Sequence, residues 1–419
     1  MERRTFLKIL SSAGIVSLVS PTFAMEVCKN KVSKSSSALL ESAFRNPPFS
    51  SGVYTWWHWM NGNITKDGIT RDLEAMKANG IAGYQLFEAG SGIPIGPVES
   101  LSDEWVDLIL HTLKESERLG LEFAMHNCPG WSSSGGPWIT PDKAMQIITW
   151  SETKITGGKQ VRIQLPTPKH MFDYYIDTYC LAIPANMKVI PRLSILELSN
   201  RLDKDGVLTW DVPTGEWLIM RFGQTAKDQK NKSAPSKSTG LDCDKFSTEA
   251  LDYHLNCMFK RLMPTMEKIA KHSKIGLLID SYETGDQDWT SDMPAYFEQS
   301  HGYELYPFLP VLANKIVESE ESTKRFLFDF RRVRADMFAE RYYGHFQKRC
   351  KEKGIITYTE PYGGNMMEEL QVAQQLDINM GEFWCGQTVL WANYKYNRTV
   401  KQVASIVHTL GGKVVGAEA

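Results

Sequence analysis

Carboxylate side chains follow several short apolar runs in the second half of the sequence, and they are the residues best suited to chemistry. The clearest case is Lys274–Glu283 (KIGLLIDSYE), in which an apolar run ends abruptly in polar residues. An apolar run of this length is typical of a strand covered on both faces. Three later runs end similarly, at Glu360, Glu382 and Glu418. Because α/β barrels keep their chemistry at the carboxyl ends of parallel strands, the pattern predicts a carboxylate-lined pocket.

Paired carboxyl groups can cleave a glycosidic bond, a reaction that needs one protonated acid and one ionised carboxylate. In a barrel the two groups come from different strand ends, so a wide separation in sequence is expected. We predict Glu283 as the acid, because a neighbouring carboxylate and partial burial favour a protonated carboxyl group. Asp280 and Tyr282 beside it are expected to contact the substrate. A Glu283 that caps a helix or pairs with a cation is the alternative.

Glu382 and Glu360 lie in distinctive surroundings. Glu382 is part of GEFWCG, where we expect Gly381 to let the backbone approach a ligand and Trp384 to form a wall of the site. Glu360 is part of TEPYGG, a loop that its proline and glycines would fix in shape, and we expect it to contact the substrate. For these two residues and for Glu418, a solvated carboxylate at a strand end is the alternative.

Aromatic and polar side chains near two other strand ends could recognise a sugar. His126 and Asn127 follow the third strand and precede Trp131, and their polar groups would suit hydroxyl recognition. Trp57 and His58 lie near the end of the first strand, on opposite faces of it, so one would belong to the core and the other to the site. We include all five among the candidate substrate-binding residues. For any single histidine, a bond to neighbouring backbone is the alternative.

The elements that would position these residues begin with a β-α-β-α-β rhythm. Strand-like runs at 52–60, 81–87 and 121–125 alternate with helical patterns at 67–79 and 103–119. Short turns separate them. This alternation is typical of a parallel sheet with crossover helices.

The rhythm is then interrupted. Residues 145–235 alternate polar and apolar positions, which predicts a small antiparallel β unit. Helical patterns resume at 246–271 and 323–353, and the four strands that end in carboxylates follow or separate them. The sequence therefore predicts an α/β fold: an incomplete (β/α)8-type barrel of about seven strands, with an antiparallel β unit inserted after strand three.

We divide the chain into five segments on this basis. They are a signal peptide at 1–24, a mobile lead-in at 25–47, a first barrel part at 48–145, the inserted β unit at 146–240 and a second barrel part at 241–419. Because strand seven ends with the chain, we expect a truncation before strand eight. An open barrel and a miscounted strand are the alternatives.

The N-terminus is typical of a bacterial export signal. Arg3 and Arg4 precede Phe-Leu-Lys, an apolar stretch follows at 9–20, and Thr-Phe-Ala at 22–24 offers a cleavage site. The twin arginine resembles a Tat signal, with an ordinary Sec signal as the alternative. Either signal predicts a periplasmic or secreted protein.

Composition excludes several other classes of protein. The 419 residues carry a formal net charge of −2, which gives no case for binding nucleic acid or an anionic membrane. No other stretch approaches the length of a membrane span. The seven cysteines include no CxxC spacing, which argues against a zinc site, and their odd number argues against a fully paired disulfide framework.

Several motifs together resemble bacterial α-L-rhamnosidases of glycoside hydrolase family 106. The resemblance runs from about residue 50 to the end. The segments that carry it are YTWWHWMNGNITKDGITRDLEAMKANGIAGYQLFE, HNCPGWSSSGGPWI, GLDCDKFSTEALDYHL, DSYETGDQDWT, TYTEPYGG and GAEA. Members of the family are usually longer, so the chain resembles their N-terminal catalytic part.

The resemblance implies a hydrolase that removes terminal α-L-rhamnosyl residues with inversion, from plant-type or other rhamnose-containing glycans. It implies Glu283 as the general acid, Glu382 as the base with Glu418 as second choice, and a calcium ion near the sugar hydroxyls. The calcium ligands are not placed, although Glu360 offers suitable oxygens. No organic cofactor is implied.

Two alternatives remain at this point. One is a non-catalytic, truncated remnant or sugar-binding protein with the same pocket. The other is a retaining glycosidase of another barrel family, whose carboxyl groups would lie ~5–5.5 Å apart rather than the ~6.5–9.5 Å of an inverting enzyme.

Overall fold

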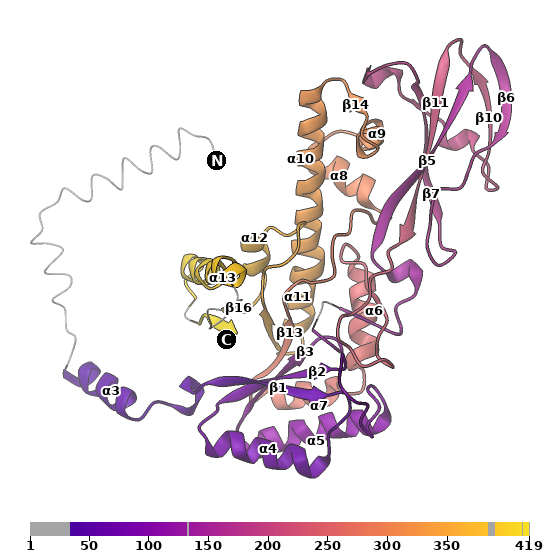
Figure 1. Ribbon diagram of the computed structural model, residues 1–419. Helices are drawn as coiled ribbons and strands as arrows, with labels where there is room; N and C mark the ends of the chain where they lie inside the picture. Colours follow the sequence, from indigo (N-terminus) through magenta and orange to yellow (C-terminus); the bar gives the residue numbers. More distant parts are fainter. Residues whose placement is uncertain (1–33, 132–133, 384–389, 413, 419) are drawn as a thin grey trace, which may run out of the picture. The chain divides into compact units, whose positions relative to one another are not determined.

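The computed structural model describes residues 34–131, 134–383, 390–412 and 414–418 (Figure 1). These residues form two units, divided between Val53 and Tyr54. The first unit contains helix α3 (Lys34–Arg45) and the short 3-10 helix η1 (Phe49–Ser51), so a helix occupies much of the expected lead-in. The predicted export signal lies outside the described residues. Among the helices that are described, none has the length and apolar character needed to span a bilayer.

The second unit is built on a seven-stranded sheet in which every pair of neighbouring strands is parallel. The spatial order of the strands is the same as their order along the chain. Both features confirm the predicted incomplete barrel. In sheet order the strands are β1 (Tyr54–Met60), β2 (Gly83–Ala89), β3 (Glu122–His126), β13 (Ile275–Ile279), β15 (Ile356–Thr359), β16 (Ile378–Glu382) and β17 (Gly416–Glu418).

β13 is the central strand of the sheet, and all five of its residues are buried. Leu277 lies opposite Met125 of β3 on one side and Thr357 of β15 on the other. Because both faces are covered, the strand is apolar throughout instead of alternating. Gly276 lies under the ring of Tyr358, so close that a Cβ would stand 2.4 Å from a ring atom.

The first two crossovers are made by α4 (Lys66–Ala78) and α5 (Asp103–Leu119), which pack side by side along β1 and β2 (Figure 1). Each helix begins at a hydroxyl cap. Thr65 accepts the backbone N–H of Gly68, and Ser102 accepts that of Trp105. These caps satisfy N–H groups that the helices themselves cannot pair.

The β unit inserted between β3 and β13 is antiparallel, which confirms its prediction. One sheet has the order β5-β11-β7-β9, and β6 pairs with β10 beside it. Its own apolar core includes Leu165, Cys180 and Trp210. The strands are β5 (Gln146–Thr156), β6 (Lys159–Gln164), β7 (Ile176–Pro184), β9 (Leu196–Glu197), β10 (Val207–Val212) and β11 (Glu216–Ala226).

Two helical patterns that the sequence presents as continuous are divided in the structure. The pattern at 246–271 forms α6 (Thr248–Phe259) and α7 (Met263–Ala270), with Pro264 in the first turn of α7. Proline fits a first turn but not a helix interior, which accounts for the break.

The pattern at 323–353 forms α10 (Glu320–Met337), a π-helical segment (Phe338–Gly344) and α11 (His345–Lys351). The wider π turn leaves Tyr342 and Tyr343 buried together behind the strand ends. The remaining strands and α-helices are β4 (Gly135–Gly136), β8 (Val189–Ile190), β12 (Leu241–Asp242), β14 (Ile316–Val317), α8 (Met293–His301), α9 (Leu309–Leu312), α12 (Glu369–Ala373) and α13 (Leu390–Thr409).

A buried carboxyl group in β2 should make the stability of the fold depend on pH. Glu88 is 4% exposed and accepts a hydrogen bond from Ser100 Oγ at 2.9 Å. Burial raises its pKa to about 7, whereas a glutamate in an unfolded chain has a pKa of about 4.3. Between these values the folded protein binds more protons than the unfolded chain, so stability falls as the pH rises through this range.

We predict that Glu88→Gln stabilises the protein more at pH 8 than at pH 5, by about 2 kcal/mol in urea unfolding, because the amide stays neutral. Glu99→Gln, at an exposed position, is the control. An effect of Glu88→Gln that is equal at the two pH values would contradict the prediction.

Candidate active site

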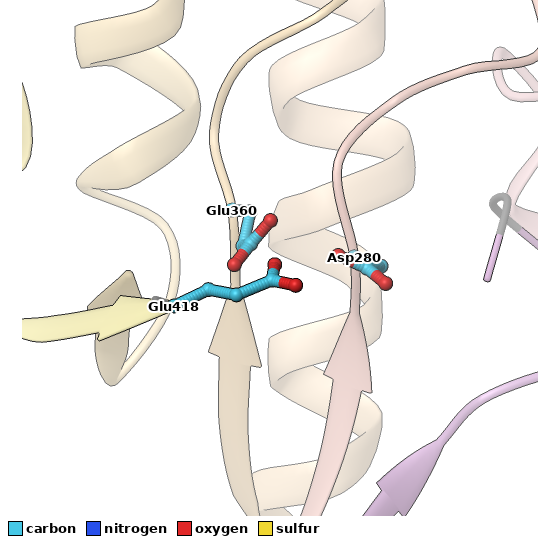
Figure 2. A group of neighbouring side chains, drawn as sticks. All are labelled: Asp280, Glu360 and Glu418. Carbon is cyan, nitrogen blue, oxygen red and sulfur yellow. The ribbon is translucent and has the colours of Figure 1, made fainter. Parts of the chain in front are cut away.

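Three carboxyl groups meet at the carboxyl end of the sheet. Asp280 follows β13, Glu360 follows β15, and Glu418 belongs to β17. Each offers an oxygen, and these oxygens all lie within 4.8 Å of one another. Figure 2 shows Glu360 and Asp280 directly beyond the arrowheads of their neighbouring strands, with Glu418 reaching toward both from β17. We call these three residues the carboxyl cluster.

Burial and mutual repulsion control the protonation of the carboxyl cluster. Glu360 is fully buried, and loss of solvent together with the charges of Asp280 and Glu418 raises its pKa well above the usual range. Glu418 is only partly buried, and burial and the charge of Asp280 raise its pKa to about 7. In the absence of a cation, the cluster therefore holds protons near neutral pH.

Tyr362 connects the carboxyl cluster to Glu382 at the end of β16. Its hydroxyl oxygen lies 2.5 Å from Glu360 Oε2 and 2.8 Å from Glu382 Oε2. A phenol has one proton and can donate to only one of these oxygens, so the other contact needs a proton from a carboxyl group. The raised pKa of Glu360 makes it that donor, and Tyr362 in turn donates to Glu382.

His126 supports the other side of the carboxyl cluster. Its Nε2 lies 2.9 Å from Asp280 Oδ2 and its Nδ1 lies 3.2 Å from the Leu86 carbonyl oxygen. The carbonyl can only accept, so Nδ1 carries a proton. Asp280 provides an acceptor on the other side of the ring. Trp56 of β1 stacks on the imidazole at 5.0 Å and helps to fix its orientation.

Glu283 lies at the rim of the site, with 38% of its side chain exposed. Its Oε2 accepts from the Trp131 indole N–H and from the Lys232 ammonium, both at 3.2 Å, so Glu283 does pair with a cation, the alternative that the sequence left open. Trp131 in turn stacks on Phe87 at 5.4 Å. The two donors and the stacked ring fix the position of the Glu283 carboxyl group.

Glycines allow the loops that carry these residues to approach closely. Gly363 has φ +112° and lies against Tyr282, where a Cβ would stand 2.3 Å from the carbonyl oxygen. The backbone N–H of Tyr282 donates to the Tyr362 carbonyl at 2.9 Å, which joins the loops after β13 and β15. We expected Gly381 to let the backbone approach a ligand. In the structure it makes room for helix α13, because a Cβ there would stand 2.7 Å from Val400.

The structure places two predicted substrate-binding residues, Trp57 and Asn127, away from the site surface. Trp57 is a correction: it lies on the helix-facing side of the sheet, where its indole N–H donates to Asp72 of α4 at 3.0 Å. Asn127 is fully buried, and its amide donates to the Leu278 carbonyl at 2.8 Å. Both side chains form hydrogen bonds within the fold.

The other predicted residues divide between the site and its support. His58 is exposed and packs against Phe87 at 4.7 Å, so it remains a candidate for ligand contact. Tyr282 is buried, and its hydroxyl donates to the Gly285 carbonyl at 2.7 Å, which supports the loop that carries Glu283. Trp384 lies outside the described residues.

Sequence reasoning missed Tyr362 and Phe87. Tyr362 could have been found, because it follows Glu360 by two residues within a motif already singled out. The sequence predicted that carboxyl groups from the strand ends converge, but it did not show that Asp280, Glu360 and Glu418 are the three that meet. Three carboxyl groups provide only oxygen ligands, the kind that calcium prefers, and Glu360 Oε1 has no hydrogen-bond partner among the described residues.

Comparisons with known proteins identify the family and agree with the fold. A family model described as alpha-L-rhamnosidase, glycoside hydrolase 106, matches residues 45–177 and 167–419. A protein of Formosa agariphila, provisionally named beta-glucuronidase, is 41% identical over 410 residues, which cover 90% of this chain and 35% of that protein. The structure of a rhamnosidase from Novosphingobium sp. PP1Y shares the fold, with a TM-score of 0.82 at 24% identity. That match covers 91% of this chain and 53% of the other. The chain therefore spans about a third and about half of these two proteins.

We predict that Glu360→Gln raises the thermal stability of the metal-free protein, because the amide keeps the shape of the side chain and removes one of three crowded carboxyl groups. The expected gain, measured by calorimetry in a chelating buffer at pH 8, is about 1 kcal/mol. Glu360→Ala should lower stability, since it leaves a cavity. A lower melting temperature for Glu360→Gln would contradict the prediction, because it would show that repulsion within the carboxyl cluster does not destabilise the folded protein.

Proposed function

The chain belongs to glycoside hydrolase family 106, the α-L-rhamnosidases, and we propose that it removes terminal α-L-rhamnosyl residues from glycans with inversion of configuration. The observation that carries this proposal is the convergence of carboxyl groups from the ends of β13, β15, β16 and β17. Such a set can supply the base of a glycoside hydrolase, and Glu283, in the loop after β13, can supply the acid. Its setting in an incomplete barrel, at the carboxyl ends of the strands, is where barrel enzymes bind their substrates.

In the proposed mechanism Glu283 is the general acid. It donates a proton to the glycosidic oxygen as the bond from that oxygen to the anomeric carbon breaks. Its place at the rim supports this role, because the leaving sugar must depart toward solvent. Trp131 and Lys232 hold the carboxyl group in one orientation before substrate arrives.

Glu382 is the proposed base. It takes a proton from the water molecule that attacks the anomeric carbon from the opposite face. The Tyr362 hydroxyl fixes the carboxylate through Oε2. Glu418 remains the second choice as base, because its pKa of about 7 also suits proton transfer. We prefer Glu382, because Glu418 belongs to the carboxyl cluster that is suited to hold a cation.

Calcium is the proposed resident metal, with Asp280, Glu360 and Glu418 as ligands. Their carboxyl oxygens lie close enough together to share one ion, and the unpartnered Glu360 Oε1 would gain a partner. A bound calcium ion would offset the repulsion among the three groups and would bind hydroxyl oxygens of the sugar.

The acid and the base can be distinguished, because only loss of the acid should affect the rate differently for good and poor leaving groups. We predict that Glu283→Gln slows hydrolysis of a rhamnosyl disaccharide by about 10²–10⁴-fold but slows an activated aryl α-L-rhamnoside much less, because a good leaving group needs little protonation. Glu382→Gln should slow both substrates by similar factors. The measurements are kcat values for the 419-residue chain and its variants, with the exposed Glu104→Gln as control.

An aryl β-D-glucuronide belongs in the same panel, because one relative carries that name. Release of the aryl group from the glucuronide and not from the rhamnoside would overturn the proposed substrate. A Glu283→Gln variant at the wild-type rate on the disaccharide would exclude Glu283 as the acid.

We predict that Ca²⁺ stabilises the chelator-treated protein, by about 2.7 kcal/mol at a hundredfold excess over its dissociation constant. Asp280→Asn and Glu360→Gln should abolish this gain, and Glu283→Gln should keep it. Calorimetry with and without Ca²⁺ measures the shift in melting temperature. An equal shift in all three variants would place calcium elsewhere.

A further inference from the structure

A cavity lies in the inserted β unit, apart from the carboxyl cluster. It has a volume of about 390 Å³, which is in the range of pockets that bind small ligands. Three segments line it. They are the start of β5 at 147–150, the loop at 169–171 and the end of β11 with its next residues at 225–228.

The wall of this cavity is bonded to the loop that carries Glu283. The backbone N–H of Ile148 donates to Asp288 Oδ1 at 2.9 Å, and Gln146 forms a β-bridge with Trp289. The Lys227 ammonium donates to the Asp286 carbonyl at 2.5 Å. Because Asp286 follows Glu283 by three residues, one loop forms the rim of the candidate active site and supports the wall of the cavity.

The lining suits one face of a sugar ring. Trp150 is half-buried and packs obliquely on Phe222, at 6.2 Å and 39° between the rings. Ile147 and Met171 add apolar surface. An indole that is held in place but still accessible can pack against the C–H groups of a sugar.

The charges that line the cavity are mainly positive. Among the lining residues, Lys169 and Lys227 are cationic and Asp228 is anionic, and Asp228 Oδ1 lies 3.8 Å from the ammonium of Lys230. The Asp288 carboxylate, which lies behind the wall, accepts from the Ile148 backbone N–H. His170 Nδ1 donates to the Pro168 carbonyl at 2.9 Å, which leaves Nε2 free of that contact for a polar group of a ligand. Such a lining would attract an anionic group that carries hydroxyls nearby.

We propose that this cavity is a subsite for an anionic sugar residue on the leaving-group side of the cleaved bond. The proposal rests on the proposed function, since it extends that substrate by a residue bearing a carboxylate or a sulfate ester. Lys169 is its main charge contact, because Lys227 is already bonded to the Asp286 carbonyl. Trp150 is its stacking surface.

The test compares two disaccharides, α-L-rhamnose linked to galacturonic acid and the same linkage to galactose. We expect the wild-type chain to prefer the uronate by about 3–10-fold in kcat/KM, and Lys169→Gln to bring the ratio near one without changing hydrolysis of an aryl rhamnoside. The matched control is Lys204→Gln, an exposed lysine of the same β unit outside the cavity. A wild-type ratio of one, or an unchanged ratio in Lys169→Gln, would overturn the subsite.

A galactose-6-sulfate analogue of the same disaccharide distinguishes the two anionic groups, since a preference for it over the uronate assigns the subsite to sulfate esters. If no rhamnoside is hydrolysed, the proposed function fails, and calorimetric binding of trigalacturonate to the chain decides the subsite separately. We then expect binding that weakens with salt and weakens about 3–10-fold further in Lys169→Gln. Equal binding by wild type and Lys169→Gln would overturn the proposal.

Discussion

Repulsion among carboxyl groups that share a buried site is the constraint on which the rest of this structure depends. Asp280 and Glu360 are buried and Glu418 is partly so, and their oxygens lie within 4.8 Å of one another. Water cannot screen charges there, so the group is stable only with added protons or with a cation. The raised pKa values of Glu360 and Glu418 mean that the metal-free cluster holds added protons. The proposed calcium ion would be the stabilising cation.

A layer of buried polar contacts holds the strand ends in place against this repulsion. Lys245, which is fully buried, pairs with Asp242 and donates to the Ser134 carbonyl at 3.0 Å. Tyr342, from the π-helical segment, places its ring 5.0 Å from the same ammonium and bonds to Ser134 Oγ at 2.7 Å. Ser134 also donates to the amide oxygen of Asn127, next to His126. These contacts fix the loop after β3, so that the imidazole meets Asp280 in one orientation.

The sequence predicted the strands and their terminal carboxylates well, because an apolar run that stops at a polar residue marks both the strand and its end. It predicted the inserted β unit for a similar reason, since alternation differs clearly from a buried run. The alternation of side chains along β1 places Trp57 and His58 on opposite faces of the strand. It does not show which face meets the helices, because that depends on tertiary packing. The contact between Tyr362 and Glu382 and the grouping of the carboxyl cluster join residues from different strands, and a single sequence carries no measure of those distances.

The central claim is that two carboxyl groups direct a water molecule onto the anomeric carbon without a covalent intermediate. Proton NMR of the hydrolysis of an aryl α-L-rhamnoside tests it most directly, since the anomeric signals of the first-formed sugar report the stereochemistry. We predict that β-L-rhamnose appears first and that the α-anomer grows in later by mutarotation. If α-L-rhamnose appears first, the configuration is retained, and a covalent intermediate would replace the acid and base roles assigned to Glu283 and Glu382.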